Sequence, residues 1–278
     1  MLASRMEPLK NMPVYIDIQT YADLDKDVPE NKAADLRIRI PLDMRAEATC
    51  RAQTVQSLRR AQIALREIGV ALHAASPERI IVTGGGLFAV TFALGGMLSQ
   101  RRIQCPVIIE DQYGNAWGLP GHDNGQHRVS KMRPVAVAHP NAKSGRVAVL
   151  IGGSKTDPKL FDDFVQSPDL NIAAAGHFSC ESTDPAKQSG LIQDGEGLRL
   201  AEEFETAVTA FATAENAYDI VLCCALGFPM SVLLGRLFNK YRVTCYDLDS
   251  TPQYQPMLVI SSTDAQIEQI CEENPYSP

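Results

Sequence analysis

The chain has 278 residues, of which 45% are hydrophobic and 21% charged, and 26 lysines and arginines against 33 aspartates and glutamates give a net charge of −7. This composition is typical of a globular protein with one large or two small domains, and it excludes a disordered chain, a collagen-like fibre and a disulfide-scaffolded mini-protein. The negative charge argues against general DNA or RNA binding, which needs a basic surface, but it leaves room for a small anionic ligand held by a local cluster of donors.

The apolar pattern alternates short strands with helices along the chain. In chain order we expect strands at 14–18 and 36–40, a helix at 51–73, a strand at 79–82, a helix at 87–99, a strand at 103–108, a short edge strand at 135–138, a strand at 146–151, a helix starting near Pro158, a strand at 171–174, a polar loop at 176–195, a helix at 198–214, a strand at 220–224, a helix at 230–238, and strands at 243–246 and 257–261. This alternation predicts βαβ units with a mostly parallel sheet.

The elements repeat once. A constant shift of 140 positions aligns two segments without a gap and pairs six identical residues, namely Ile80 with Ile220, Phe88 with Phe228, Leu94 with Leu234, Gly95 with Gly235, Arg102 with Arg242 and Cys105 with Cys245. The shared order of strand, small-residue turn, apolar helix and strand is stronger evidence than the identities. We therefore predict an α/β fold of two fused Rossmann-like halves, each with a mostly parallel sheet, in a pseudo-two-fold arrangement.

The predicted domain boundaries follow from this repeat. They are an N-terminal extension at 1–35, a first half at 36–134, a second half at 135–263, and an acidic C-terminal tail at 264–278 that forms a short helix followed by disorder. The seven cysteines are odd in number and form no C-x-x-C motif, so they indicate reduced thiols. With neither a signal peptide nor an apolar stretch of ~18 residues, we expect a cytoplasmic protein without a membrane span.

Three turns at the carboxyl ends of strands are candidate binding sites, because ligands of open parallel sheets bind there. Thr83, Gly84, Gly85 and Gly86 lead directly into the helix that begins at Leu87. Three glycines allow close backbone approach, and a helix N-terminus favours an anion such as a phosphate. The alternative is a tight turn that serves strand–helix packing. The segment is neither G-x-G-x-x-G nor a P-loop.

The other two turns belong to the second half. In one, Gly153 and Ser154 supply close donors and Lys155 supplies a mobile positive charge, unless the lysine is simply solvated at a helix start. The other turn consists of Ala225, Leu226, Gly227 and Phe228. Four aromatic residues follow strands and can stack on nucleobases or pack in the core, namely Tyr113, Trp117, Tyr246 and Tyr254.

Catalytic patterns are sparse. The five histidines show no H-x-x-x-H spacing, no Cys-His cluster has zinc spacing, and the G-x-S-x-G and H-E-x-x-H motifs are missing from the sequence. Asp247 and Asp249 fit a metal pair or a turn, and His177 fits a phosphate donor or a structural loop residue. We expect no catalytic residue, no metal and no cofactor.

The second half carries the most specific pattern: a strand at 219–224, the turn and helix start at 225–230, Leu-Gly-x-x-Phe-Asn at 234–239, a strand ending in Tyr-Asp at 243–247, and Tyr-x-Pro at 254–256. With 81–95 of the first half, this pattern resembles the SAVED domain, the ligand-sensing module of cyclic-oligonucleotide-based antiphage (CBASS) effectors. The resemblance covers about residues 35–262. It implies two Rossmann-like halves similar to the CARF sensors of type III CRISPR systems.

The resemblance also implies a function. SAVED domains bind cyclic di-, tri- or tetranucleotides between the halves, and binding drives self-assembly that activates a fused effector. Residues 1–35 are too few for an HNH nuclease, a TIR domain or a Lon-type protease, so this chain is expected to be either the sensing subunit of a split effector or an excised sensor domain. For a split effector, the partner is a nuclease, TIR or protease polypeptide acting in trans.

We therefore expect a non-enzymatic receptor that binds a cyclic oligonucleotide, forms higher-order homo-oligomers with it, and contacts neither membrane nor DNA or RNA directly. Two unequal halves favour a cyclic trinucleotide. The alternatives are a Rossmann-like enzyme, such as a ring nuclease or a hydrolase that uses Ser154 or Asp247, and a scaffold that has lost ligand binding. The expected ligand-binding residues are Thr83, Gly84, Gly85, Gly86, Leu87, Gly153, Ser154, Lys155, Ala225, Leu226, Gly227, Phe228, Tyr113, Trp117, Tyr246 and Tyr254.

Overall fold

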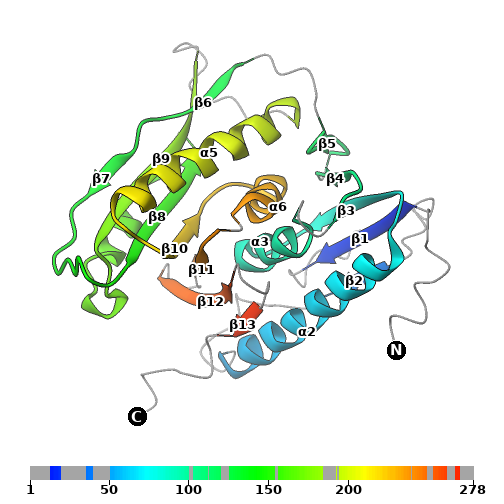
Figure 1. The fold of residues 1–278 in the computed structure, drawn as a ribbon, viewed down its shortest axis with the longest axis horizontal. Coiled ribbons are helices and arrows are strands. Elements are labelled where there is room, and N and C mark those ends of the chain that lie inside the picture. The colour runs from blue at the N-terminus through cyan, green and yellow to red at the C-terminus, as the bar shows by residue number, and fades with distance from the viewer. Residues whose placement is uncertain are drawn as a thin grey trace.

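Two β-sheets with helices packed between and around them make up the molecule (Figure 1). The computed structural model describes residues 13–19, 36–39, 51–99, 103–111, 113–119, 125–153, 156–183, 192, 194–238, 240–248, 253–261 and 267–269. None of the helices in these ranges is long and apolar enough to cross a membrane. The α/β architecture with mostly parallel sheets confirms the predicted fold class.

The first sheet has the strand order β2-β1-β3-β4-β5. Its strands are β1 (Pro13–Gln19), β2 (Leu36–Arg39), β3 (Arg79–Gly85), β4 (Val107–Glu110) and β5 (Ala116–Trp117). All neighbours are parallel except β4 and β5, which form an antiparallel hairpin.

The second sheet has the order β13-β12-β11-β10-β8-β9-β6, and β7 pairs with β9 beside this path. Its strands are β6 (His127–Val129), β7 (Arg133–Val135), β8 (Arg146–Gly153), β9 (Ala174–Ser182), β10 (Asp219–Cys224), β11 (Arg242–Leu248), β12 (Tyr254–Ile260) and β13 (Ile267–Gln269). The central strands β9, β8, β10 and β11 are parallel, whereas β12 is antiparallel to β11.

The two sheets share one topology. The order β9-β8-β10-β11-β12 repeats β2-β1-β3-β4-β5 strand by strand, including the antiparallel hairpin at the end. Helices α2 (Arg51–Ala75) and α5 (Asp194–Ala214) precede β3 and β10, and helices α3 (Phe88–Met97) and α6 (Phe228–Leu237) follow them. A helix α4 (Lys159–Phe164) and a 3-10 helix η3 (Pro168–Leu170) lie between β8 and β9.

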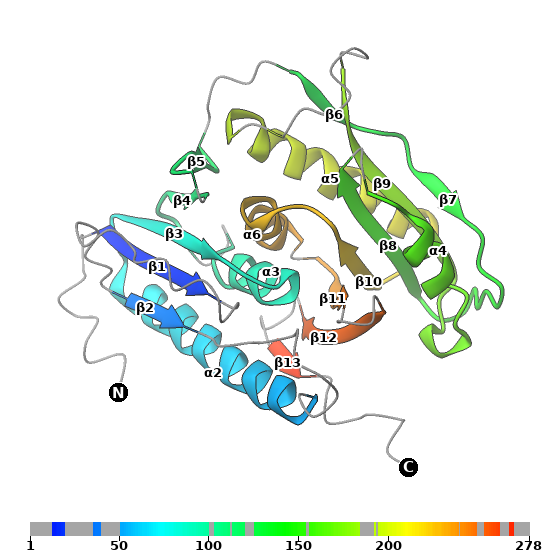
Figure 2. The same ribbon diagram turned by 180° about the vertical axis from the view of Figure 1, so that it is seen from behind.

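Helices α3 and α6 pack against each other at the centre of the molecule, as both views show (Figures 1 and 2). A Cβ added to Gly95 would lie 2.1 Å from the carbonyl oxygen of Val232, and one added to Gly235 would lie 2.0 Å from that of Phe92. The 140-residue shift relates Gly95 to Gly235 and Phe92 to Val232, so the contact is reciprocal. Reciprocal contacts of this kind define a two-fold axis, and this one passes between the two glycines.

Other contacts at the crossing follow the same relation only in part. Thr91 Oγ1 donates to the carbonyl oxygen of Leu87 at 3.1 Å, and its counterpart Ser231 Oγ donates to that of Gly227 at 3.2 Å. Arg236 breaks the symmetry: its buried Nε donates to the carbonyl oxygen of Leu98 at 3.1 Å. A continuous hydrophobic core spans both sheets and includes seven of the ten residues of α3, and a second, smaller core includes Phe161 of α4 and Leu150 of β8.

The structure differs from the predicted elements in several places. The strand expected at 171–174 starts only at Ala174, because Asn171 adopts a left-handed conformation (φ 48°) that ends η3. The loop expected at 176–195 is instead β9 up to Ser182, so His177 lies in a buried strand. In the acidic tail the expected helix is wrong for the described residues, since Ile267–Gln269 form β13.

The repeat and its boundaries also need adjustment. The shift of 140 relates β3 to β10 and α3 to α6, but β4 begins five residues later than the shift of β11 predicts, because the connection from α3 is longer. Strand β1 lies within residues 1–35, the predicted extension, yet it pairs with β2 and β3. Strand β6 lies within the predicted first half and pairs with β9 of the second sheet.

Candidate functional site

The glycine segment after Thr83 is mainly strand and only partly a turn, which corrects the sequence interpretation. β3 continues through Gly85 and stays paired with β1 to its end. Gly84 has a φ of +113°, and a Cβ there would lie 1.9 Å from the carbonyl oxygen of Ile18. The requirement for glycine at this position therefore comes from close backbone packing, which was the alternative interpretation. Only Gly86 and Leu87 connect β3 to α3.

A carboxylate from the other half contacts the N-terminus of α3. Leu87 precedes the helix and supplies no side-chain cap. Asp247 of β11 reaches this helix end, and its Oδ2 accepts a hydrogen bond from Ala89 N at 2.9 Å. The N–H of Phe88 also favours the charged form, but burial dominates and raises the pKa of Asp247 to about 6. Asp247 therefore links the second sheet to helix α3 of the first half.

The corresponding end of β10 is open. Ala225 and Gly227 are exposed, and Gly227 begins α6 without a side-chain cap. A Cβ added to Gly227 would meet only Pro229 Cδ, at 4.0 Å, and one added to Gly153 would meet only Leu226 Cδ2, at 4.0 Å. The turns after β8 and β10 therefore lie side by side with space beside both glycines.

The turn after β8 is held by a threonine. Gly153 N donates to Thr156 Oγ1 at 2.9 Å, and Thr156 N donates to the carbonyl oxygen of Gly153 at 3.0 Å. Thr156 occupies the space that a Cβ on Gly152 would need. Ser154 and Lys155, which the sequence analysis selected as phosphate donors, lie outside the described residues, as does Asp249.

Two of the four aromatic candidates belong to a packed cluster. The rings of Tyr246 and Tyr254 each lie 5.1 Å from Phe164, and Tyr254 also meets Phe161 at 6.5 Å. Burial raises the pKa of both tyrosines. These contacts with α4 fit the core-packing alternative, and both side chains keep part of their surface accessible.

The other two aromatic candidates lie apart from that cluster. Trp117 is buried under α5, where its ring fills the space beside Gly197, and its Nε1 donates to Asp111 Oδ2 at 3.1 Å. Tyr113 is 76% exposed at the tip of the β4–β5 turn. The structure therefore does not bring the four aromatic residues together into one base-stacking surface.

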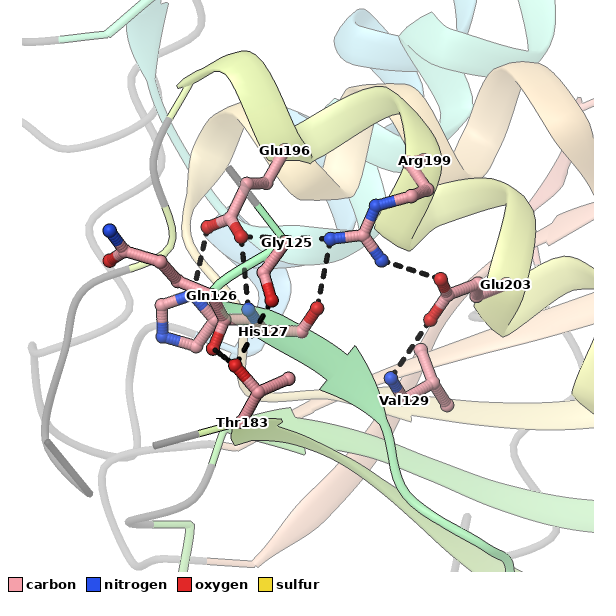
Figure 3. A network of polar contacts seen from close by, with 8 residues as sticks. All are labelled: Gly125, Gln126, His127, Val129, Thr183, Glu196, Arg199 and Glu203. Carbon is pink, nitrogen blue, oxygen red and sulfur yellow. Dashed lines mark hydrogen bonds and ion pairs between the residues drawn. The ribbon is translucent and has the colours of Figure 1, made fainter. Parts of the chain in front are cut away.

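A buried network between β6 and α5 escaped the sequence analysis (Figure 3). Glu196 accepts hydrogen bonds from His127 N at 2.9 Å and pairs with His127 Nδ1 at 2.8 Å, and both residues are almost fully buried. Arg199 donates to the carbonyl oxygen of His127 at 2.8 Å, and Glu203 accepts from Val129 N at 3.0 Å. Since these side chains bind strand backbone, the network anchors an edge strand.

Two acidic side chains lie near the carboxyl ends of strands. Asp17 is buried in β1 beside Thr83, and Asp247 contacts α3. The sequence shows both residues within apolar strands, but nothing in it indicates which helix end an aspartate will meet. Within the described ranges, no group of three or more His, Cys, Asp or Glu residues could hold a metal ion.

Comparisons with known proteins identify similar folds. No model of a known protein family matches the chain, and neither does a curated protein. The Acinetobacter baumannii Cap4 SAVED/CARF-domain containing receptor, in its structure with the cyclic trinucleotide 2′3′3′-cAAA, matches with a TM-score of 0.62 and 17% identity over 88% of this chain and 51% of its own. The same receptor with 3′3′3′-cAAA gives a TM-score of 0.60.

A second receptor gives a similar result. The Moraxella osloensis Cap4 SAVED/CARF-domain containing receptor matches with a TM-score of 0.54 and 15% identity over 89% of this chain and 49% of its own. This chain thus spans about half the length of the receptors that it matches. The strand order, the reciprocal helix contact and these superpositions together show that the chain has the fold of the SAVED/CARF-domain receptors.

Proposed function

We propose that this chain is a non-enzymatic receptor that binds a cyclic oligonucleotide, with a cyclic trinucleotide favoured, at the carboxyl ends of its strands. The observation that carries the proposal is the open second-half edge, where Gly153 and Gly227 leave space beside an uncapped helix N-terminus. A receptor with the same fold has structures with two different cyclic trinucleotides, which supports such a ligand here.

The chemistry of this edge suits a phosphodiester ring. A helix N-terminus presents backbone N–H groups and a partial positive charge, both of which favour a phosphate. Ala225, Leu226 and Phe228 line the turn with apolar surface for a base. Ser154 and Lys155 follow Gly153 directly in the sequence, so their hydroxyl and ammonium groups are proposed as further phosphate donors.

The first half is proposed to complete the binding surface with Gly85, Gly86 and Leu87. Tyr113 is a proposed base contact because it is exposed, and the accessible edges of Tyr246 and Tyr254 are proposed to contact the ligand from the α4 side. Trp117 is not part of the proposed binding surface, because its ring is packed under α5 and its Nε1 donates a hydrogen bond to Asp111.

We further propose that ligand binding drives assembly of this chain into higher-order oligomers that activate an effector polypeptide in trans. A ligand shifts such an equilibrium by its differential affinity for the assembled state. Sedimentation with and without saturating ligand tests this part. A saturated protein that stays monomeric would leave this chain as a binding subunit only.

The binding experiment is isothermal titration calorimetry with a panel of cyclic di-, tri- and tetranucleotides, with linear triadenylate as control. The proposal expects one ring to bind at least about a hundredfold more tightly than the linear form, because a closed ring loses less conformational freedom on binding. No binding by any ring would overturn the proposed function. Chromatography of the titrated sample reports linear product, which would point to a ring nuclease instead.

Two variants locate the binding site. Gly227→Val should abolish binding without loss of stability, because a Cβ there meets only Pro229 at 4.0 Å while its methyl groups would block backbone approach. Lys155→Glu should weaken binding by about tenfold or more at low salt. The matched control is Lys159→Glu, which makes the same charge reversal at an exposed residue of α4. This variant should leave the affinity unchanged. Normal affinity in Gly227→Val would exclude this edge.

A further inference from the structure

The pseudo-two-fold axis relates two aspartates that make different contacts. Strand register places Ile109 beside Val82 in the first sheet and Cys245 beside Leu222 in the second. Val82 and Leu222 are counterparts under the 140-residue shift. Two residues farther along each strand are Asp111 and Asp247, which are therefore structural equivalents at the carboxyl ends of β4 and β11.

Asp111 stays within its own hairpin. Its carboxylate accepts hydrogen bonds from Tyr113 N at 2.8 Å, Asn115 N at 2.9 Å, Asn115 Nδ2 at 2.9 Å and Trp117 Nε1 at 3.1 Å. Although partial burial opposes ionisation, these donors lower the pKa of Asp111 below its usual value. The short β4–β5 connection makes this possible, because it returns Asn115 to the strand end.

Asp247 crosses to the other half instead. Strand β11 continues to Leu248, so Asp247 still lies within the strand, where it pairs with Gln255 of β12. Its Oδ2 accepts a hydrogen bond from Ala89 N in the first turn of α3. The counterpart of Ala89 in α6 is Pro229, which has no N–H to donate. The two differences fit each other. Of the two helices, α3 offers the N–H donor and α6 does not, and of the two aspartates, Asp247 reaches the helix while Asp111 is bonded within its own hairpin.

We propose that Asp247 is a specificity-determining residue that keeps phosphate away from the N-terminus of α3, so that the phosphates of the ligand gather at the α6 side of the binding surface. This inference rests on the proposed function. The carboxylate already satisfies the donor that an anion would use, and its negative charge repels a second anion. The ligand should therefore present a base or ribose, rather than a phosphate, to α3.

The surroundings of Asp247 strengthen its effect. The titratable groups that interact with it are the thiols of Cys223, Cys224 and Cys245 and the phenol of Tyr254, and burial raises the pKa of each. All four stay neutral at physiological pH. The groups that shift the pKa of Asp247 itself, within the described part of the chain, include no lysine or arginine. Backbone N–H groups of α3 are thus the donors that favour the charged form of Asp247 in this part of the chain.

The charge of Asp247 should make the ligand affinity depend on pH. Ligand phosphates near a carboxylate raise its pKa, so the complex binds more protons than the free protein, and affinity must rise on acidification. With the pKa of Asp247 at about 6 in the free protein, the change should occur between about pH 7.5 and pH 5.5. Backbone phosphodiesters remain ionised throughout this range.

The experiment measures the Kd of 3′3′3′-linked cyclic triadenylate at pH 7.5, 6.5 and 5.5 for wild type, Asp247→Asn and Asp111→Asn. The asparagine Oδ1 can still accept from Ala89 N, so the fold should persist. Wild type should tighten by about tenfold on acidification, as expected for a shift of one pKa unit. Asp247→Asn should bind about tenfold more tightly than wild type at pH 7.5 and show no pH dependence. Asp111→Asn should keep the wild-type pH profile.

Two outcomes would overturn the inference. If Asp247→Asn binds more weakly than wild type, the carboxylate accepts a hydrogen bond from the ligand rather than excluding phosphate. If both proteins bind equally at all three pH values, Asp247 has no influence on the ligand. Failure of every variant to bind would overturn the proposed function together with this inference. The contact can also be tested without ligand, by following the amide chemical shifts of Phe88 and Ala89 as the pH is changed. These shifts should depend on pH in the wild type and should lose that dependence in Asp247→Asn.

Discussion

The two halves agree in topology but differ in how their chemistry is distributed over the sheet ends. Charged residues at the amino ends of the strands concentrate in the second half, where Asp219 Oδ2 lies 3.0 Å from Arg146 Nε and 3.0 Å from Arg242 NH1. The position equivalent to Asp219 in the first half is Arg79, an exposed residue opposite Pro13. The difference teaches that the two halves share the backbone topology, whereas the side-chain networks are specific to each half.

The helix crossing is the strongest test of the shared plan, and Gly95→Ala and Gly235→Ala should each lower the free energy of unfolding by about 2–4 kcal/mol. The added methyl group would meet a backbone carbonyl that cannot move aside without separating the helices. Urea denaturation followed by circular dichroism measures the effect.

The matched control is the neighbouring Gly96→Ala. A Cβ at Gly96 would lie 3.6 Å from Ile260 Cγ2, an ordinary contact, so this variant should be stabilised by up to about 1 kcal/mol through helix propensity. If Gly95→Ala is as stable as Gly96→Ala, the close reciprocal contact, and with it the axis, is wrong.

The charge network offers the next largest effect. Asp219→Ala should cost about 2–3 kcal/mol, because it leaves Arg146 and Arg242 without their shared carboxylate while Arg146 is mostly buried. Arg79→Ala, at the equivalent place in the first half, should change stability by less than about 0.5 kcal/mol. Thermal unfolding of both variants measures the difference, and equal effects would contradict the asymmetry between the halves.

The equivalent aspartates should give pH profiles of opposite sign. Because the folded-state pKa of Asp247 is raised to about 6, its stabilising contribution is complete at low pH and is lost as pH rises through 6. Asp247→Asn should therefore be about 1–2 kcal/mol more stable than wild type at pH 7.5, and this advantage should vanish near pH 4.

For Asp111 the sign reverses. Its pKa is lowered, so its contribution is present above the usual aspartate pKa and is lost as pH falls below it. Asp111→Asn should be less stable than wild type at pH 7.5 and approach it in acid. Denaturant midpoints collected from about pH 2 to about pH 8 cover both transitions and distinguish the two. Parallel profiles would refute the assigned contacts.

The smallest expected effects test whether the helix starts are equivalent. Thr91→Val and Ser231→Ala each remove one hydroxyl that donates to a carbonyl oxygen four residues earlier. Each should cost about 1 kcal/mol, the usual net value of one hydrogen bond. Similar losses, measured by chemical denaturation, are expected for the pair; a loss confined to one helix would show that the counterparts differ in burial or in alternative partners.

Sequence periodicity predicted the fold well because buried parallel strands and apolar helices have strong local patterns. Both central helices and most strands lie where these patterns indicate. Most of β9 was missed, and a loop was expected from residue 176 instead. Its sequence, Ala174–Ser182, contains no valine, isoleucine or threonine and includes a glycine, so it lacks the branched side chains typical of strands. The paired extent of β3 was missed because a glycine run normally indicates a turn.

The candidate site could be predicted less completely. Position at a strand end is a property of topology, so the turns at Gly153 and Gly227 could be located from the sequence. Contacts across the halves could not, because no local pattern indicates that Asp247 meets Ala89 or that Trp117 fills the space beside Gly197. The roles of the aromatic residues depend on those long-range contacts.

The burial of α3 has a consequence for how the protein can be divided. Every residue of this helix except Gly96 is buried, and α6 and the second sheet cover much of it. A fragment that ends before β8 would present that covering surface to water as a broad apolar face, and such faces promote aggregation. We therefore expect both halves to melt in one cooperative transition, and either half expressed alone to be insoluble.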